Sequence, residues 1–193
     1  MSISLKRVSL LSPDYNRIRK LYLTAFPTEE RTPFPILMAK SGKDGADFWA
    51  VYKDDNWIGI AYNVSRRDIT YLFYLAVAES ERGKGYGSLI LKTLKRYYEG
   101  QRYFLALEQL DENAENYTER VSRRRFYEKN GFAPMNCRIK EAKVTYDVMC
   151  IGGSVSPEEY KELMGGYLGK FFHKLIPMEI IPGEDGKENS NEA

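Results

Sequence analysis

The chain of 193 residues carries a formal charge of +2, with 43% hydrophobic and 29% charged residues. These values are ordinary for a soluble globular protein, and the length favours one domain with a sizeable core. A charge so close to neutral does not favour nucleic-acid binding, which usually needs a clustered basic face. It leaves room for a local basic site that receives an anion. The two cysteines, Cys137 and Cys150, are too few for a disulfide framework and lack metal-ligand spacing, so we expect no metal site.

No segment has the pattern of a signal peptide or a membrane span. Residues 1–8 lack an apolar core of signal-peptide length, and no apolar run approaches the roughly 18 residues that a span needs. We therefore expect a cytoplasmic protein that binds neither membrane nor nucleic acid. Aromatic residues make up 13% of the chain and include 15 tyrosines. Each tyrosine buries a ring but keeps a hydroxyl that needs a partner.

The N-terminal quarter predicts a short strand and two helices. Residues 8–11 are expected as an edge strand, and Ser12-Pro13 resembles an N-cap followed by proline at the first helical position. Prolines then separate this helix from a short second one that ends near Gly42. The polar connection between them, residues 28–32, is expected to be mobile.

Three strands and a helix follow. Residues 47–52 and 57–64, joined by turn residues, predict an antiparallel hairpin. Residues 69–78 are aromatic and β-branched, which indicates a central strand covered on both faces. After a glycine-rich turn, residues 88–99 have a helical apolar face.

The second half continues with a strand over residues 102–108 and a polar segment over residues 111–120. A helix containing Tyr127 ends at Asn130-Gly131, a pair suited to a left-handed C-terminal cap. Residues 138–151 predict either one strand or a hairpin.

The chain ends with one more predicted helix and a polar tail. Ser156-Pro157-Glu158-Glu159 is a capping box with proline at the first helical position, so a helix over about residues 157–175 is expected. Residues 182–193 are polar and expected to be disordered. The element order predicts an α+β fold with one mixed central sheet flanked by helices. We expect a single domain over residues 1–180, with its core in about residues 5–151.

The glycine-rich turn is the segment that indicates chemistry. It reads Arg82-Gly83-Lys84-Gly85-Tyr86-Gly87-Ser88 and lies between a strand and a helix. Glycines allow close approach of the backbone to a ligand, and the first amides of a helix lack internal partners. Together with the helix dipole and two cationic side chains, they predict a phosphate or diphosphate site.

Two nucleotide-binding motifs fit this turn poorly. A P-loop needs Gly-Lys followed by Ser or Thr, but Gly85 follows Lys84. The dinucleotide fingerprint G-x-G-x-x-G, counted from Gly83, has Ser88 in its last position. Glu108 does lie at the distance where that fingerprint places an acidic residue. That fingerprint also needs an early β-α-β unit, whereas two helices and a hairpin come first.

The turn resembles the pyrophosphate-binding motif of the GNAT superfamily, Arg/Gln-x-x-Gly-x-Gly/Ala, with Arg82, Gly85 and Gly87 in the defined positions. Residues 75–79 look like the fourth strand of that family. Residues 125–132 resemble its later helix, which commonly ends in Tyr-x-x-x-Gly-Phe. The resemblance covers about residues 5–151 and implies a GNAT-like acyl-CoA N-acyltransferase fold with an additional C-terminal helix.

The resemblance implies acetyl-CoA as the acyl-donor cosubstrate. The end of the fourth strand would pair with the pantetheine arm and direct an amide at the thioester carbonyl, and Tyr127 would contact the cosubstrate and protonate the leaving thiolate. The implied cofactor-binding residues are Leu75, Ala76, Val77, Arg82, Gly83, Lys84, Gly85, Tyr86, Gly87, Ser88 and Tyr127, and the catalytic ones are Tyr127 and Glu108.

The general base is less well defined. Some relatives have a glutamate where this chain has Tyr71. Glu108 at the end of the next strand is the candidate, since a buried carboxylate is able to accept a proton. It is otherwise an ion-pair partner, or water carries the proton away. Many relatives also have Asn and Ala where this chain has Arg120 and Arg123. These arginines and their neighbours would contact CoA phosphates or form a solvated basic face.

The function implied is transfer of an acetyl group from acetyl-CoA to a primary amine, by direct attack in a ternary complex. The acceptor would be a small molecule or a peptide. Glu29 and Glu30 lie in a loop that often lines the acceptor site in relatives, where they would attract a cationic amine or remain solvated. The alternative is a GNAT-fold module that binds CoA without catalysis. The aromatic terminal helix also raises the possibility of a homodimer.

Overall fold

The computed structural model describes residues 3–141, 144–169 and 178–182. The chain divides into two compact units, residues 1–104 and residues 105–193, which are described separately. The single domain expected over residues 1–180 stays a prediction.

Unit 1 contains a four-stranded antiparallel sheet in the order β1-β2-β3-β4, and the beginning of β5 pairs in parallel with β4. Two 3₁₀ turns, Thr28–Glu30 and Glu79–Glu81, precede α2 and α3. The helices and strands are β1 (Ile3–Arg7), α1 (Tyr15–Ala25), α2 (Phe34–Lys40), β2 (Ala46–Lys53), β3 (Asn56–Arg66), β4 (Ile69–Val77), α3 (Tyr86–Tyr97) and the start of β5 (Arg102–Glu108).

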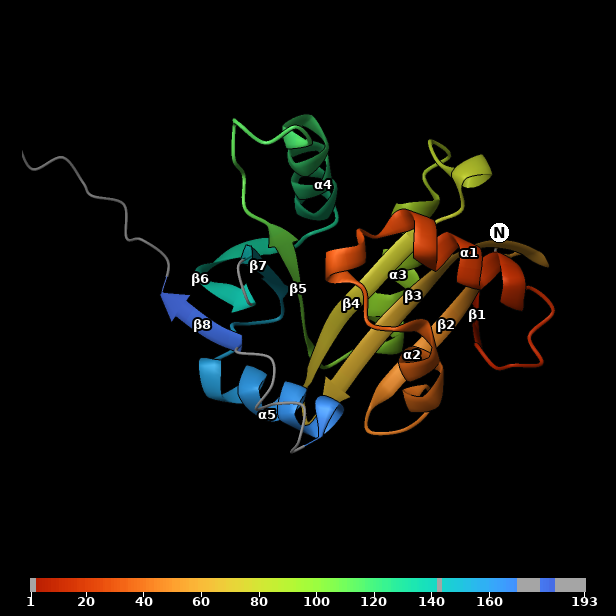
Figure 1. Cartoon of the computed structure of the whole chain (residues 1–193), viewed down its shortest axis with the longest axis horizontal. Coiled ribbons are helices and arrows are strands. Elements are labelled where there is room, and N and C mark those ends of the chain that lie inside the picture. The colour runs from red at the N-terminus through yellow and green to blue at the C-terminus, as the bar shows by residue number, and fades with distance from the viewer. Residues whose placement is uncertain (1–2, 142–143, 170–177, 183–193) are drawn as a thin grey trace, which may run out of the picture. The chain divides into compact units, whose positions relative to one another are not determined.

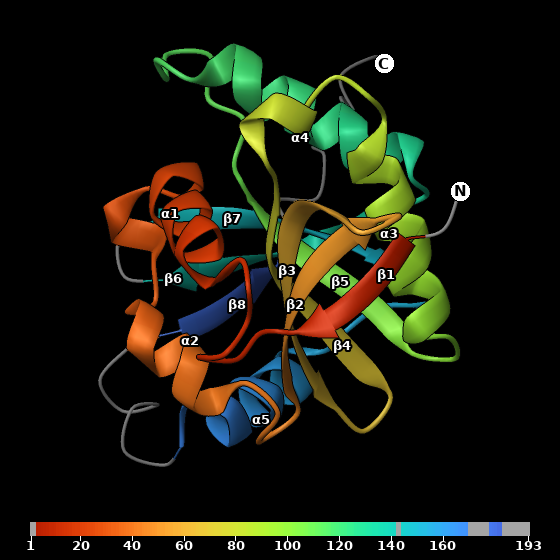
Figure 2. The ribbon, with the colours of Figure 1, turned by 90° about the vertical axis from the view of Figure 1, so that its right-hand side faces the viewer.

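Helices cover both faces of the unit 1 sheet. Helices α1 and α2 lie on one face and α3 on the other (Figures 1 and 2). On the first face, aromatic rings pack edge to face. The ring centroids of Phe34 in α2 and Phe48 in β2 are 5.9 Å apart. On the second face, the Trp49 indole donates a hydrogen bond of 3.1 Å to the Tyr98 hydroxyl, which follows α3. The high aromatic content therefore forms the core on both sides.

Unit 2 holds the remaining strands in the order β5-β7-β6-β8. Strand β6 pairs antiparallel with both β7 and β8. Its helices and strands are the end of β5, α4 (Tyr117–Lys129), β6 (Ala133–Glu141), β7 (Val144–Ile151), α5 (Pro157–Leu168) and β8 (Met178–Pro182).

Most predicted elements of the chain are confirmed. Strands β2 and β3 form the expected antiparallel hairpin. Strand β4 is buried on both faces from Ile69 to Leu72, whereas Phe73, Leu75 and Val77 on one face are only partly buried. Residues 133–151 form a hairpin, which decides between the two alternatives for this segment. Helix α4 ends at the expected place, where Gly131 has a φ of 89°. The capping box at Ser156 is formed by reciprocal bonds with Glu159.

Several predictions at element boundaries are wrong. Helix α1 begins at Tyr15 with Asp14 as its N-cap, so Ser12 and Pro13 lie before the helix, and β6 begins at Ala133, five residues before the predicted start. The edge strand is Ile3–Arg7, not residues 8–11, and the amide of Val8 donates to Phe48 O only as the last bond to β2. Helix α3 begins at Tyr86, two residues before the predicted start at Ser88, because Gly85 takes the left-handed conformation and serves as its N-cap. Helix α5 ends at Leu168, before Gly169 with its φ of 82°. Residues 170–175 of the predicted helix and 183–193 of the predicted tail lie outside the described residues.

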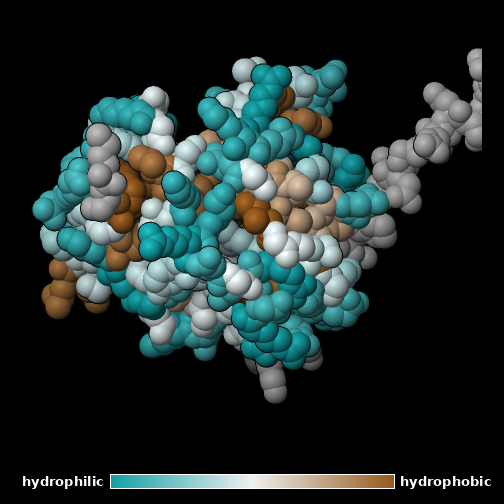
Figure 3. Space-filling model, turned by 180° about the vertical axis from the view of Figure 1, so that it is seen from behind, coloured by the Kyte–Doolittle hydropathy of each residue, from teal (hydrophilic) through white to brown (hydrophobic). Residues whose placement is uncertain are grey.

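The surface in Figure 3 is largely hydrophilic, with several hydrophobic areas. The most exposed large apolar side chains are Leu10 and Leu11, at 74% and 94%, in the loop between β1 and α1. Within the described part of the chain, no helix is both long and apolar enough to cross a membrane.

Replacing Tyr98 with phenylalanine tests the polar contacts of the unit 1 core. The Tyr98 hydroxyl donates to Asp47 Oδ2 at 2.9 Å and accepts from Trp49. Its loss leaves the buried Trp49 N–H unsatisfied, so the free energy of unfolding should fall by about 1–3 kcal/mol in urea denaturation. An unchanged stability would contradict this assignment.

The same variant should change the alkaline pH dependence of stability. Burial, with a contribution from the Asp47 carboxylate, raises the pKa of Tyr98 above its ordinary value of about 10. Above that pH the unfolded phenol loses its proton while the folded one keeps it, so stability falls as the pH rises. Tyr98→Phe should make this fall shallower.

Candidate active site

The glycine turn in unit 1 has the geometry of an anion site. Gly83 and Gly85 have φ values of 75° and 78°, a conformation that glycine adopts without strain. A Cβ atom at either position would meet nothing within 4 Å, so the space next to the turn is open. The first backbone bond of α3 runs from Leu89 N to Gly85 O at 3.3 Å.

The amides of the three glycines in this turn are available to a ligand. Among the described residues, no backbone acceptor is found for the amides of Gly83, Gly85 and Gly87. The first amides of a helix have no carbonyl one turn earlier, and the helix dipole favours negative charge at that end. The turn therefore offers several N–H groups and a positive potential to one anion.

The end of β4 presents backbone groups away from β3. The amide of Ala78 donates to Ile58 O at 2.8 Å, so Ala78 and Ile58 form a hydrogen-bonded antiparallel pair. Amides alternate in direction along a strand, and the register with β3 is regular from Tyr74 to Val77. The N–H groups of Leu75 and Val77 therefore point to the side opposite β3.

On that opposite side, the parallel ladder with β5 consists of three residue pairs, from Ile69 with Arg102 to Tyr71 with Phe104. The part of β4 that carries Leu75, Ala76 and Val77 comes after these pairs. Its outward amides and carbonyls form an edge able to pair with an extended ligand, as an added strand would.

Two local features shape this edge. The register with β3 passes from Tyr62–Tyr74 to Asn63–Leu72, so Phe73 is a bulged residue, and bulges often redirect groups near active sites. Gly59 of β3 lies opposite Val77, and a Cβ there would lie 2.4 Å from Ala76 O. A larger residue would therefore displace the end of β4. Neither feature was predicted from the sequence, although a glycine within a strand signals close backbone approach.

The two cationic side chains of the turn are partly engaged. Arg82 Nε donates to Val77 O at 3.2 Å, which ties the turn to the end of β4. Lys84 Nζ lies 3.1 Å from Glu81 Oε2, and its side chain is 51% exposed. Exposed ion pairs of this kind are weak, so Lys84 is free to turn toward an anion.

In unit 2, Tyr127 is the buried residue of α4, packed against Phe126 and Phe132 at ring distances of 5.0 and 5.6 Å. Its hydroxyl has no hydrogen-bond partner among the described residues. Burial raises the pKa of Tyr127 to about 12, and nearby Arg123 opposes this only in part. The phenol is therefore a neutral hydrogen-bond donor at neutral pH.

Glu108, at the end of β5, is held by two arginines of α4. Its Oε1 lies 2.8 Å from Arg120 Nη2. Its Oε2 lies 3.1 Å from Arg123 Nη1 and 3.4 Å from the side-chain nitrogen Nδ2 of Asn116. Both carboxylate oxygens therefore already accept hydrogen bonds. This arrangement supports the ion-pair alternative for Glu108, and its role as general base stays a prediction.

The basic residues of α4 are mostly paired within unit 2. Arg120 also donates to Gln109 O at 2.7 Å, and Arg124 pairs with Asp147 of β7. Arg125 is exposed and makes no ion pair within the described part of the chain. Arg120 and Arg124 are therefore paired with carboxylates of β5 and β7, whereas Arg123 and Arg125 are exposed, and contact of this cluster with CoA phosphates stays a prediction.

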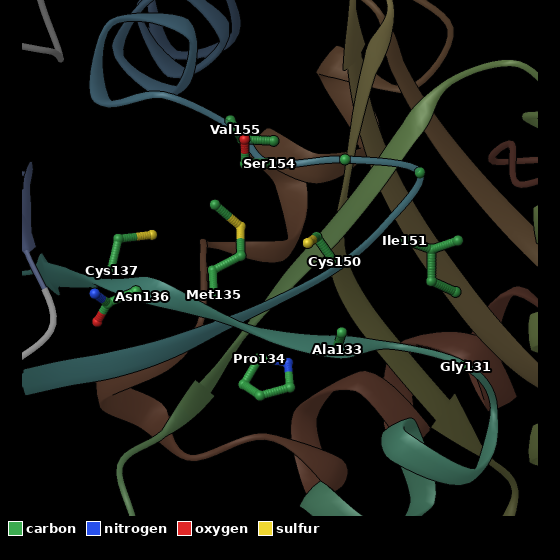
Figure 4. A pocket seen from close by; sticks show the side chains of 12 residues that line it. Gly131, Ala133, Pro134, Met135, Asn136, Cys137, Cys150, Ile151, Ser154 and Val155 are labelled. Carbon is green, nitrogen blue, oxygen red and sulfur yellow. The ribbon is translucent and has the colours of Figure 1, made fainter. Parts of the chain in front are cut away.

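A separate pocket in unit 2 lies along β6, β7 and the loop before α5, with a volume of about 650 Å³. Met135, Cys137 and Cys150 are among its lining residues (Figure 4). Burial raises the pKa of both thiols, so the cysteines are in the protonated form at neutral pH. The pocket contains none of the predicted site residues. Nor do the described residues bring together three His, Cys, Asp or Glu side chains to hold a metal ion.

Residues 44–134 match the family described as acetyltransferase (GNAT) domain, a range that includes the glycine turn and Tyr127. These 91 of the chain's 193 residues are similar to a GNAT acetyltransferase domain. No curated protein matches the sequence.

Solved structures share the fold of this protein at low sequence identity. A structure assigned to the GNAT family from Bacteroides thetaiotaomicron has a TM-score of 0.68 and 19% identity, covering 88% of this chain and 98% of its own. An aminoglycoside 6'-N-acetyltransferase complexed with coenzyme A has a TM-score of 0.59 and 16% identity, covering 78% and 96%. The ribosomal-protein-S18-alanine N-acetyltransferase from Escherichia coli has a TM-score of 0.57 and 15% identity, covering 81% and 97%.

Glu108→Gln tests whether the carboxylate fixes α4 of unit 2. Loss of the charge should lower the free energy of unfolding by about 1–3 kcal/mol, mostly through the largely buried Arg120, because exposed pairs contribute little. The effect is measured by urea denaturation. The control Glu112→Gln, at an exposed position, should stay within about 0.5 kcal/mol of the wild type. Equal effects of the two substitutions would show that the ion pairs of Glu108 are dispensable.

Proposed function

We propose that the protein is an N-acetyltransferase that transfers the acetyl group of acetyl-CoA to a primary amine, by direct attack in a ternary complex. The observation that carries the proposal is that unit 1 holds both the outward amides of β4 and the amides of Gly83, Gly85 and Gly87, for which no backbone acceptor is found among the described residues. Two structural neighbours support it, an aminoglycoside 6'-N-acetyltransferase complexed with coenzyme A and a ribosomal-protein-S18-alanine N-acetyltransferase.

The residues of the turn fit a diphosphate. The amides from Gly83 to Ser88 would donate to its oxygens, and Arg82 and Lys84 would add positive charge. The open space at Gly83 and Gly85 admits a group of this size close to the backbone.

The edge of β4 fits the remainder of the donor. Leu75, Ala76 and Val77 would pair with the amide groups of the pantetheine arm, and an outward N–H of Leu75 or Val77 would donate to the thioester carbonyl. The amine nitrogen forms a bond to the carbonyl carbon while negative charge develops on the carbonyl oxygen. The carbon–sulfur bond then breaks, the nitrogen loses a proton, and the thiolate gains one. One such oxyanion donor is typically worth about 3–4 kcal/mol in the transition state.

Tyr127 is our candidate for the group that contacts the leaving sulfur. Its raised pKa makes the phenol a weak acid but keeps it protonated, so donation of a hydrogen bond to the forming thiolate is its natural role. Its lack of a hydrogen-bond partner among the described residues leaves the O–H available.

The proton of the amine needs an acceptor, and Glu108 or water would serve. The ion pairs of Glu108 with Arg120 and Arg123 favour a positioning role for this carboxylate. Glu108→Gln separates the two roles in a pH–rate profile. If Glu108 is the general base, the pH–rate profile of the variant should lose its acidic limb. If Glu108 is a positioning residue, the variant should have a lower kcat and keep the acidic limb.

The acceptor would be a small-molecule amine or a peptide amine, and a cytoplasmic location without nucleic-acid or membrane partners is part of this proposal. A homodimer stays a prediction, to be measured by light scattering. The buried aromatic side chains of α5, among them Tyr160 and Tyr167, favour packing within the chain over a free face for a second subunit.

Gly85→Ala should weaken acetyl-CoA binding. An alanine at a φ of 78° costs about 1–2 kcal/mol and shifts the turn amides away from the diphosphate. We expect the Kd for acetyl-CoA to rise about tenfold in calorimetric titration, equivalent to ~1.4 kcal/mol. Gly100→Ala is the matched control, since Gly100 has a φ of 83° and equally open surroundings. Equal affinities in the two variants would argue against the turn as the diphosphate site.

Tyr127→Phe should lower kcat about 10²-fold, the lower range for general acid–base groups, with little change in the Kd for acetyl-CoA. In the wild type, ionisation of Tyr127 should cause no loss of activity until the pH approaches about 12, because only the protonated phenol donates. Tyr117→Phe, at the start of the same helix, is the control. Unchanged turnover in Tyr127→Phe would show that the assignment is wrong.

A further inference from the structure

We infer that the pocket of unit 2 is a binding site for a soft monovalent metal ion, Cu(I), held by the sulfur atoms of Met135, Cys137 and Cys150. All three residues line the pocket and belong to the hairpin of β6 and β7. The site lies outside the proposed donor site and does not depend on the proposed acetyl transfer.

The hairpin brings the three sulfur-bearing side chains together. Side chains alternate between the two faces of a strand, so Met135 and Cys137 of β6 share a face with Ala133. Ala133 is the cross-strand partner of Cys150 in β7, and residues directly opposite each other also share a face. Figure 4 shows Met135 between the two cysteines. The spacing of the cysteines in the sequence predicted no metal site, because this neighbourhood comes from strand pairing.

The two thiols are close enough to affect each other. Burial and, after it, the charge of Cys150 raise the pKa of the Cys137 thiol. Neither cysteine is in a disulfide, and both are half-buried, as is Met135. Their sulfur atoms are therefore able to meet an ion that enters the pocket from solvent.

An irregular stretch of β6 gives the pocket its room. Between the pairs Pro134–Met149 and Arg138–Asp147, β6 has three residues and β7 has one. Such a bulge bends the strand and redirects its side chains. The backbone is nevertheless fixed just beyond the bulge, because β6 pairs there with β7 on one side and with β8 on the other.

The loop after β7 forms the other wall of the pocket. Gly152 and Gly153 have φ values of 84° and 127°, which allow the chain to turn sharply directly after the strand. Ile151 and the buried Val155 give this wall an apolar surface. Water is therefore a poor competitor for an ion bound to the sulfur atoms.

The donor set selects the metal. Within the described part of the chain, no charged side chain and no histidine lines the pocket, so the hard cations Mg²⁺ and Ca²⁺ find no carboxylate there. Thiolate and thioether sulfur are soft ligands that suit Cu(I). On binding, each thiol releases its proton to solvent and forms a sulfur–copper bond, whereas the thioether donates a lone pair and keeps its substituents. The flexible Met135 side chain is able to turn toward the ion.

The test is an anaerobic titration of the full chain with tetrakis(acetonitrile)copper(I), in competition with bathocuproine disulfonate and with glutathione in excess. We expect one Cu(I) per chain. Cys137→Ser and Cys150→Ser should each raise the Kd for Cu(I) at least about 100-fold, because each removes a thiolate. Met135→Leu should raise it about tenfold, because it removes the neutral thioether.

Met149→Leu is the matched control, since Met149 precedes Cys150 but is fully buried and does not line the pocket. It should leave the Kd for Cu(I) unchanged. Equal effects of Met135→Leu and Met149→Leu would overturn the assignment of the thioether ligand.

A second measurement uses the wild type, so it does not depend on the folding of any variant. Cys137 and Cys150 are the two cysteines of the chain. One equivalent of Cu(I) should protect both from alkylation by iodoacetamide, as measured by mass spectrometry. Failure to bind copper one to one, an unchanged Kd in the serine variants, or alkylation of either cysteine in the presence of copper overturns the inference and leaves the proposed function untouched.

Discussion

Strand β4 pairs with β3 along its length, but its ladder with β5 consists of three residue pairs. The candidate donor site of unit 1 depends on this constraint. After Tyr71, the N–H and C=O groups of β4 that point away from β3 lie beyond the last of these pairs with β5. An extended ligand is able to pair with them as an added strand would. The bulge at Phe73 and the close approach of Gly59 set the course of the strand there, and Arg82 joins its end to the glycine turn.

Helix α4 of unit 2 is held in a different way. Of its 13 residues, Tyr127 is the buried one, so burial of apolar area contributes little to its placement. Carboxylates at two positions, Glu108 and Asp147, bind arginines of the helix. Ion pairs need matched partners in defined places, and losing one partner leaves the other uncompensated. The orientation of Tyr127 therefore depends on charged residues that a hydrophobic pattern does not reveal.

The sequence predicted those parts of the protein that local patterns encode. Alternation and turn residues identified the β2–β3 hairpin, and the glycine spacing identified the turn from Arg82 to Ser88. The start of α3 was placed two residues late because the left-handed cap at Gly85 is a backbone property. Strand β8 was missed because its five residues pair with β6, a strand far earlier in the sequence, and no local pattern reveals that partner.

The site contacts that were missed are long-range. Nothing in the sequence spacing of Cys137 and Cys150 predicts that they line one pocket with Met135, since the pairing of β6 with β7 brings them together. Glu108 was identified as a carboxylate near the site, but its pairing with Arg120 and Arg123 follows from how α4 packs in unit 2. Such contacts arise from tertiary structure, whereas the diphosphate turn is contiguous and was found from sequence alone.

The most direct test of the central claim is to mix the wild-type protein with acetyl-CoA and measure free thiol with and without primary amines, with mass spectrometry of the amine. The account predicts thiol release that requires the amine, and a matching gain of one acetyl group on the amine nitrogen. Thiol release that is independent of every amine, or no binding of acetyl-CoA at millimolar concentration, would contradict it.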